Sequence, residues 1–250
     1  MNKAIKPPVR TPATRAVSGT HFAEATVALD SILNGRKITN YLPLTFIGSA
    51  ATSAGERLTA GTTVSVQATV RQEKWASPEG QKRSKVRLQA LRHEVLDGDF
   101  ATIADRNGGQ RLAEGVNSAL LGGNLVSTPE VRYTPAGDAV TDFTLALNEK
   151  FTNRASEPVE RTSFVEVTAW KELAVKVASM VKGTPLTVIG AAISDSWTDK
   201  DGNKRSALKF EAAQIFMVQP SQGGCPELAP ATASGQPGVD LLPPEGDLPF

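Results

Sequence analysis

Apolar and polar residues alternate in four short segments of the chain. These are VSVQATV (64–70), VRLQAL (86–91), DFTLAL (142–147) and FVEVTAW (164–170). Alternation with a period of two puts every second side chain on the same face, so each segment predicts a strand with one buried face. Phe143 and Phe210 continue the alternation among apolar residues, and we assign both rings to the core.

A short helix is predicted directly after the last of these strands. In KELAVKVASMVKG (171–183), one helical face carries Leu173, Val177, Met180 and Val181, and Gly183 fits a C-cap. Strands, one short helix and then further strands follow one another in the order of a small barrel.

The chain also contains a long internal repeat. WTDKDGNKRS (197–206) resembles WASPEGQKRS (75–84), and at the same offset of 122 positions Gly183 matches Gly61. An interval of this length is typical of a duplicated globular domain, because solenoid units are only about 20–50 residues long. We therefore predict a first domain over 1–96, a linker over 97–116 and a second domain over 117–218.

The repeated motif predicts a β-hairpin in each copy. Asp201 and Gly202 favour a two-residue turn, and Gly80 marks a looser version of it in the first copy. With Asp201 and Gly202 as the turn, Lys204 would lie opposite Asp199 on the face that carries Trp197. This register would make an aromatic ring and a cation project together.

The last 32 residues, 219–250, have a different composition. They contain seven Pro and five Gly with almost no aromatic residues, so they offer too little apolar area to offset the entropy of ordering, and we predict a disordered tail. The tail holds four acids and no Lys or Arg, which leaves the remaining 218 residues with 27 bases and 22 acids. The body is therefore mildly basic and the tail acidic.

The inventory of reactive residues argues against an enzyme. Only His21 and His93 could serve as histidine bases, the single Cys225 lies in the tail, and no phosphate-binding glycine loop or zinc spacing occurs. Asp97 and Asp99 are better explained as solvated linker carboxylates than as a metal pair. We predict no catalytic residue, metal or cofactor; a metal-dependent nuclease is the alternative from another class, and it would need clustered carboxylates.

Other features bear on where the protein works. A lone cysteine forms no internal disulfide, the N-terminus lacks the apolar run of a secretory signal, and no apolar run is long enough to span a bilayer. We expect a cytoplasmic protein that does not contact membranes.

Aromatic residues interleaved with bases point to nucleic acid as the ligand. The second copy places Phe151, Phe164, Trp170 and Trp197 among polar strands, with several Lys and Arg nearby. A flat ring can stack on any nucleobase, and neighbouring cations can hold the phosphates. Trp197 fits stacking better than core packing because it ends a strand beside a charged hairpin, whereas Phe164 fits either role. Lys204 and Arg205 could also be simply solvated turn residues.

The second copy resembles a known family. NSALLGGNLVSTPEVRYTPAGDAVTDFTLAL, then FVEVTAWKELA and WTDKDGNKR, are similar in order to the OB-fold domain of bacterial single-stranded DNA-binding proteins. Two such domains in one chain resemble the Deinococcus–Thermus version of that family, in which two chains pair to surround DNA with four OB folds. The resemblance implies an all-β protein with two tandem five-stranded Greek-key OB barrels, each with at most one short helix, and a disordered C-terminal tail.

The same resemblance assigns the site residues. The family's base-stacking positions fall on Phe151, Phe164, Trp170 and Trp197, all still aromatic. In the first copy Tyr41 and Trp75 occupy two of these positions, while Ile32 and Ile47 stand near the others. The first copy also begins seven positions short, so its first strand or the start of it is missing, and we expect weaker binding there. The full predicted DNA-binding set is Phe151, Phe164, Trp170, Trp197, Lys204, Arg205, Arg132, Tyr41, Trp75, Lys82 and Arg83.

The C-terminus adds a third match. The family ends in an acidic peptide with an apolar tip that docks replication and repair proteins, and this chain ends in Asp247, Leu248, Pro249 and Phe250. The resemblance thus implies sequence-independent binding of single-stranded DNA during replication, recombination and repair, by a homodimer that recruits partners through its tip. The alternative within binding proteins is a specialised paralogue for phage or plasmid replication, recombination or RNA.

Overall fold

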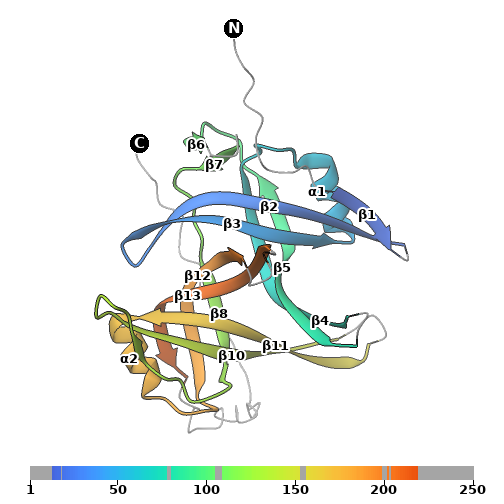
Figure 1. The fold of residues 1–250 in the computed structure, drawn as a ribbon. Helices are drawn as coiled ribbons and strands as arrows, with labels where there is room; N and C mark the ends of the chain where they lie inside the picture. The colour runs from blue at the N-terminus through green and yellow to red at the C-terminus, as the bar shows by residue number, and fades with distance from the viewer. Residues whose placement is uncertain are drawn as a thin grey trace, which may run out of the picture. The chain divides into compact units, whose positions relative to one another are not determined.

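The computed structural model describes residues 13–17, 19–77, 80–104, 109–152, 156–198, 202 and 204–218, which belong to one compact unit (Figure 1). These residues form strands with two short helices, as predicted for an all-β chain with two tandem barrels. The predicted tail, 219–250, with Cys225 and the tip Asp247 to Phe250, lies outside the described residues.

The first copy forms a curved sheet with one helix. Its elements are β1 (Ala13–Val17), β2 (Thr20–Leu33), β3 (Arg36–Ile47), α1 (Ser49–Arg57), β4 (Val64–Ala76) and β5 (Lys82–Val95). The sheet follows the order β4-β5-β3-β2, with β1 paired to β2, and β3 joins β5 in parallel at Leu44 and Leu88. Phe46, Ala51 and Ala54 are fully buried, so α1 covers the end of the core.

The second copy forms a closed barrel. Its elements are β8 (Ala119–Leu125), β9 (Arg132–Tyr133), β10 (Ala139–Thr152), β11 (Pro158–Trp170), α2 (Lys171–Ala178), β12 (Pro185–Thr198) and β13 (Lys204–Met217). Each of β8, β10, β11, β13 and β12 pairs with the next, and β12 returns to β8, which closes the five-stranded circuit. Phe143 and Phe210 are buried in this barrel, which confirms their core assignment.

The predicted helix exists but ends earlier than Gly183. Helix α2 stops at Ala178 with Ser179 as its C-cap, and Val181, which was predicted to share the helical face of Val177, lies beyond the helix and is exposed. Gly183 instead lies in the turn after the helix, with φ of 90° and its N–H donated to the carbonyl of Leu125 at 2.8 Å. The turn therefore ties the chain after α2 to the end of β8.

The repeat extends to irregular features of the backbone. A β-bulge interrupts β4 between Gln67 and Ala68, and another interrupts β12 between Ile189 and Gly190, 122 positions later. A Cβ atom on Gly190 would lie 2.0 Å from the carbonyl oxygen of Glu211, so the backbones approach too closely there for a side chain. A bulge kept at the same place in both copies increases the twist of each hairpin arm.

The first copy differs because nothing in the described ranges takes the place of β8. Strand β4 pairs with β5 along one edge, and beside Val64, Val66 and Val70 lies a cavity of about 880 Å³ that residues of the second copy also line. The sequence predicted a shortened first strand here, and residues 1–12 lie outside the described residues. The first barrel is therefore open along β4 within the part of the chain that the structure describes.

The predicted linker contains a small hairpin of its own. Strands β6 (Thr102–Ala104) and β7 (Gln110–Leu112) pair with each other, and Leu112 of β7 pairs with Leu29 of β2. Arg111 donates to the buried carboxylate of Asp30 at 2.7 Å, and the N–H of Gly115 donates to the Asp30 carbonyl at 2.7 Å. The polar segment is thus tied to β2.

Candidate nucleic-acid interface

The β10–β11 hairpin carries three of the four predicted stacking rings. Phe164 lies opposite Ala146 and Trp170 opposite Val140, so the two rings share the outward face of the sheet. Phe151 lies opposite Val159 and, because side chains alternate, it occupies the other face. The structure therefore brings Phe164 and Trp170 onto one surface but places Phe151 on the opposite face of the hairpin.

The three rings also differ in exposure. Phe164 is 37% exposed, which settles its predicted ambiguity against a core role, whereas Phe151 and Trp170 are half-buried. Trp170 is the last residue of β11, and Lys171 after it has φ of 53°, in the left-handed region. The first barrel has the corresponding strand-to-helix junction after Ile47, where Gly48 has a φ of 66°. A lysine in this strained conformation fixes the direction in which the chain leaves Trp170.

The fourth ring, Trp197, lies near the end of the β12–β13 arm and is 47% exposed. The predicted register of this arm was wrong by one residue. Trp197 lies opposite Arg205, and Lys204 lies opposite Thr198 rather than Asp199. Arg205, not Lys204, therefore shares the face of Trp197, because the loop between the strands is longer than a two-residue turn. The side chains of Lys204 and Arg205 lie outside the described part of the chain.

The first barrel has the corresponding arm with the same pairing. Trp75 is 46% exposed and lies opposite Arg83, while Lys82 lies opposite Ala76. Arg83 and Lys82 are both exposed, and Tyr41 on β3 is 36% exposed. All four predicted residues of the first copy are therefore accessible. Ile32, which stands near a third ring position, is 77% exposed and offers no aromatic face.

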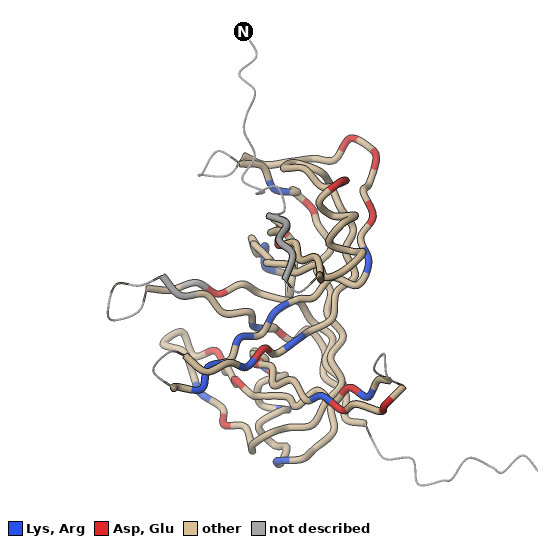
Figure 2. The backbone as a smooth tube through the Cα atoms, turned by 90° about the vertical axis from the view of Figure 1, so that its right-hand side faces the viewer, with Lys and Arg blue, Asp and Glu red and all other residues tan. Residues whose placement is uncertain are grey.

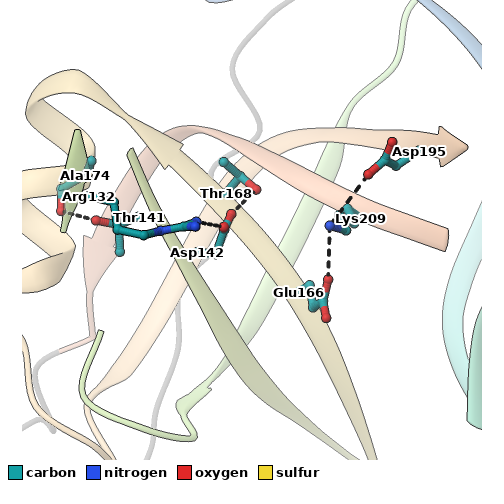
Figure 3. A network of polar contacts seen from close by, with 8 residues as sticks. All are labelled: Arg132, Thr141, Asp142, Glu166, Thr168, Ala174, Asp195 and Lys209. Carbon is teal, nitrogen blue, oxygen red and sulfur yellow. Dashed lines mark hydrogen bonds and ion pairs between the residues drawn. The ribbon is translucent and has the colours of Figure 1, made fainter. Parts of the chain in front are cut away.

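Two cations of the second barrel are compensated by carboxylates (Figure 3). Arg132, a member of the predicted DNA-binding set, forms an ion pair with Asp142, which also accepts a hydrogen bond from Thr168 at 2.7 Å. Lys209 lies between Glu166 at 3.5 Å and Asp195 at 3.6 Å. In the tube view of the chain, basic and acidic positions both lie along the strands (Figure 2). Arg132 therefore has less charge to offer a phosphate than its sequence position suggested.

Sequence reasoning missed a set of first-barrel cations that contact the rings of the second barrel. The guanidinium carbon of Arg36 lies 5.5 Å from the ring centroid of Trp170, and that of Arg71 lies 6.0 Å from the centroid of Phe151. The ammonium nitrogen of Lys74 lies 5.3 Å from the centroid of Phe164. Lys74 stands next to Trp75 in sequence, but no local sequence pattern could pair any of these three cations with a ring of the other copy.

Buried polar groups hold these contacts in place. Glu211, whose side chain is 7% exposed, accepts from Arg36 at 2.6 Å and from Asn34 at 3.2 Å. Asn34 also donates to the carbonyl of Ala212 at 3.1 Å. The tip of the β2–β3 hairpin is thereby bound to β13 of the second barrel beside Trp170.

The arrangement can bind an extended polyanion with exposed bases. Exposed rings on Phe164 and Trp197 offer stacking faces, with the Lys74 ammonium over Phe164 and Arg205 opposite Trp197 in the strand register. Within the described ranges no group of three or more His, Cys, Asp or Glu could hold a metal ion. No helix in the same part of the chain is long and apolar enough to cross a membrane.

Comparison with known proteins agrees with this geometry. Residues 9–96 and 116–218 match the model of the Single-strand binding protein family. A single-stranded DNA-binding protein from Deinococcus radiodurans is 37% identical over 204 residues, covering 79% of this chain and 68% of that protein. One from Thermus aquaticus is 34% identical over 254 residues, covering 96% of this chain and 92% of its own length. The crystal structure of the wild-type Thermus aquaticus protein superposes with a TM-score of 0.66 at 27% identity, over 88% of this chain and 93% of that one.

Proposed function

This chain belongs to the single-strand binding protein family, and from that premise we propose that it binds single-stranded DNA without sequence preference and without catalysing a reaction. The observation that carries the proposal is the pair of exposed rings, Phe164 and Trp197, on the strands and hairpin arm where the family stacks bases. Each stacked base contributes about 1–3 kcal/mol whatever its identity, which suits a binder that must accept any sequence.

A fluorescence titration tests the proposal. Oligo-dT should quench the emission of Trp170 and Trp197 strongly, and a duplex of the same length should quench it hardly at all, because paired bases cannot leave their stack to reach the rings. The titration should be run at two salt concentrations, since binding that neutralises phosphates weakens as salt rises. Equal affinity for oligo-dT and duplex would exclude the stacking model, and preference for oligo-rU would favour the RNA-binding paralogue.

The proposal extends to the role of the protein in the cell. We place it in DNA replication, recombination and repair, in the cytoplasm and associated with the nucleoid. We further propose that it acts as a homodimer with four OB folds, and that the tip Asp247 to Phe250 recruits replication and repair proteins. Support for these finer assignments comes from the family resemblance and from the acidic, apolar-tipped terminus.

The division of the chain is part of the same proposal. Domains at 1–96 and 117–218, joined by a linker at 97–116 and followed by a tail at 219–250, account for the repeat and the change in composition. Limited proteolysis followed by mass determination tests these boundaries. Early cleavage within 219–250 and persistence of a fragment that spans both domains is the expected result.

A further inference from the structure

Strand β4 of the first barrel lies alongside strand β11 of the second. The N–H of Gln72 donates to the hydroxyl of Ser163 at 3.3 Å, and the N–H of Phe164 donates to the side-chain oxygen of Gln72 at 3.3 Å. Arg71 forms an ion pair with Glu149 of β10, and its side chain is only 18% exposed. These contacts position residues 71–74 beside the ring of Phe164.

The three cations that the first barrel places on these rings are not equivalent. Arg36 is neutralised by Glu211, and Arg71 is neutralised by Glu149. Lys74 is exposed, its ammonium lies over Phe164, and it has no acidic partner among the described residues. Arg36 and Arg71 therefore hold the first barrel against the second, whereas the charge of Lys74 is free for a ligand.

The second barrel has no cation at the equivalent place on its own arm. Ser196 stands 122 positions after Lys74, at the equivalent place on the second hairpin arm. Glu166 is one of the two residues that flank Phe164 on the same face of β11, and it pairs with Lys209. A phosphate next to a base stacked on Phe164 would thus find Lys209 compensated by two carboxylates and Lys74 uncompensated.

We propose that Lys74 of the first barrel is a phosphate ligand for the DNA strand that stacks on Phe164 of the second barrel. This inference rests on the proposed binding of single-stranded DNA. The cation–π contact of an exposed lysine is weaker than the stacking of a base on the same ring. An incoming base therefore displaces the ammonium from the ring face, and the flexible lysine stem lets it move to the adjacent phosphate. The two copies then form one composite path, with rings from the second and a cation from the first.

The salt dependence of binding by Lys74→Gln in the full chain tests the inference. Each phosphate contact on a single strand contributes about 0.7 to the slope of log affinity against log salt, so the variant should lose a slope of about 0.7. Its affinity for oligo-dT should fall roughly 3–10-fold at low salt and approach that of the wild type at high salt. Lys74→Arg should restore both quantities because it keeps the charge. The matched control is Arg57→Gln at the end of α1, another exposed cation of the first barrel, which should change neither.

Three results would overturn the inference. Tighter binding by Lys74→Gln with an unchanged slope would mean that Lys74 blocks the ring of Phe164 instead of serving the DNA. An unchanged affinity and slope would mean that no phosphate reaches Lys74. A loss of affinity that Lys74→Arg fails to restore would assign the effect to local structure, which thermal unfolding of both variants would report. Failure of the wild-type protein to bind oligo-dT at all would instead refute the proposed function.

Discussion

At the scale of single residues, Asp30 shows how one buried charge joins the connector to the first barrel. Its side chain is 1% exposed, and its carboxylate accepts from Arg111 and from Thr39, each at 2.7 Å, while Lys37 lies at 3.2 Å. Burial by itself raises the pKa of this carboxyl, but the hydrogen bonds from Arg111, Thr39 and Lys37 outweigh it and hold the pKa below its usual value.

Replacing Asp30 by Asn should destabilise the protein by about 3–5 kcal/mol at neutral pH, because a neutral amide cannot replace the ion pairs that the buried carboxylate forms with Arg111 and Lys37. The folded-state pKa lies below the ordinary value, so the stabilisation is present above about pH 4 and is lost as the pH falls through the folded-state pKa. Denaturant unfolding at pH 7 and at about pH 3 measures this, and the gap between wild type and variant should shrink in acid. Asp97→Asn, at an exposed carboxylate, is the control and should cost less than about 0.5 kcal/mol. A gap that widens in acid would contradict the assignment.

At the scale of elements, the two hairpin arms are near copies. Each has a β-bulge at the same place, and each sets a Trp opposite an Arg, Trp75 with Arg83 and Trp197 with Arg205. The two tryptophans are about equally exposed, at 46% and 47%. Any difference between the arms in DNA binding must therefore come from the barrels to which they belong, since only the second has three further rings.

Trp197→Ala should weaken binding of oligo-dT more than Trp75→Ala, by about 1–3 kcal/mol, because Trp197 belongs to the barrel with three further rings and Trp75 to the one with only Tyr41 at another ring position. Affinities are measured by anisotropy of labelled oligo-dT, since tryptophan emission is altered in both variants. Thermal unfolding of each variant shows whether either indole also supports the fold. Equal losses, or a larger loss for Trp75→Ala, would show that the first barrel binds DNA as strongly as the second.

At the scale of the whole molecule, charge divides the chain into a mildly basic body and an acidic tail. The four acids of 219–250 repel DNA or compete with it for cationic surfaces, and they are followed by the apolar tip. A peptide of this kind binds partners through a few anchors, of which Phe250 offers the largest apolar area.

Deleting residues 247–250 should leave the affinity for oligo-dT unchanged or slightly raised, while it abolishes pull-down of replication and repair proteins. The comparison is made at low and high salt, with Glu227→Gln as a control that removes one tail charge and leaves the tip intact. Retention of partners by the truncated protein at both salt concentrations would show that the terminal Phe has no docking role. A fall in DNA affinity would mean that the tail belongs to the DNA-binding surface.

The sequence by itself determined the features that depend on local periodicity and on the repeat. Alternation predicts the strands and the buried rings of Phe143 and Phe210, because a strand with one buried face needs a period of two. The offset of 122 positions predicts two copies, and the exposed aromatic residues of the hairpin arms follow from the polar residues around them. The apolar spacing also predicts the helix that begins at Lys171. It does not predict where the helix ends, because Gly183 lies in the following turn and Ser179 is the C-cap.

Only the tertiary structure decided the features that depend on contacts between distant segments. The hairpin register shifted by one residue because loop length, not the Asp-Gly pair, sets it. Strand pairing put Phe151 and Phe164 on opposite faces, and it set Asp142 beside Arg132, which compensates the charge of a residue that the sequence assigned to DNA binding. The approach of Lys74 to Phe164 joins residues of different copies. No local pattern encodes this contact, because it arises from the packing of β4 against β11. Of the three first-barrel cations on the rings, Arg36 and Arg71 are paired with carboxylates, which leaves the charge of Lys74 available.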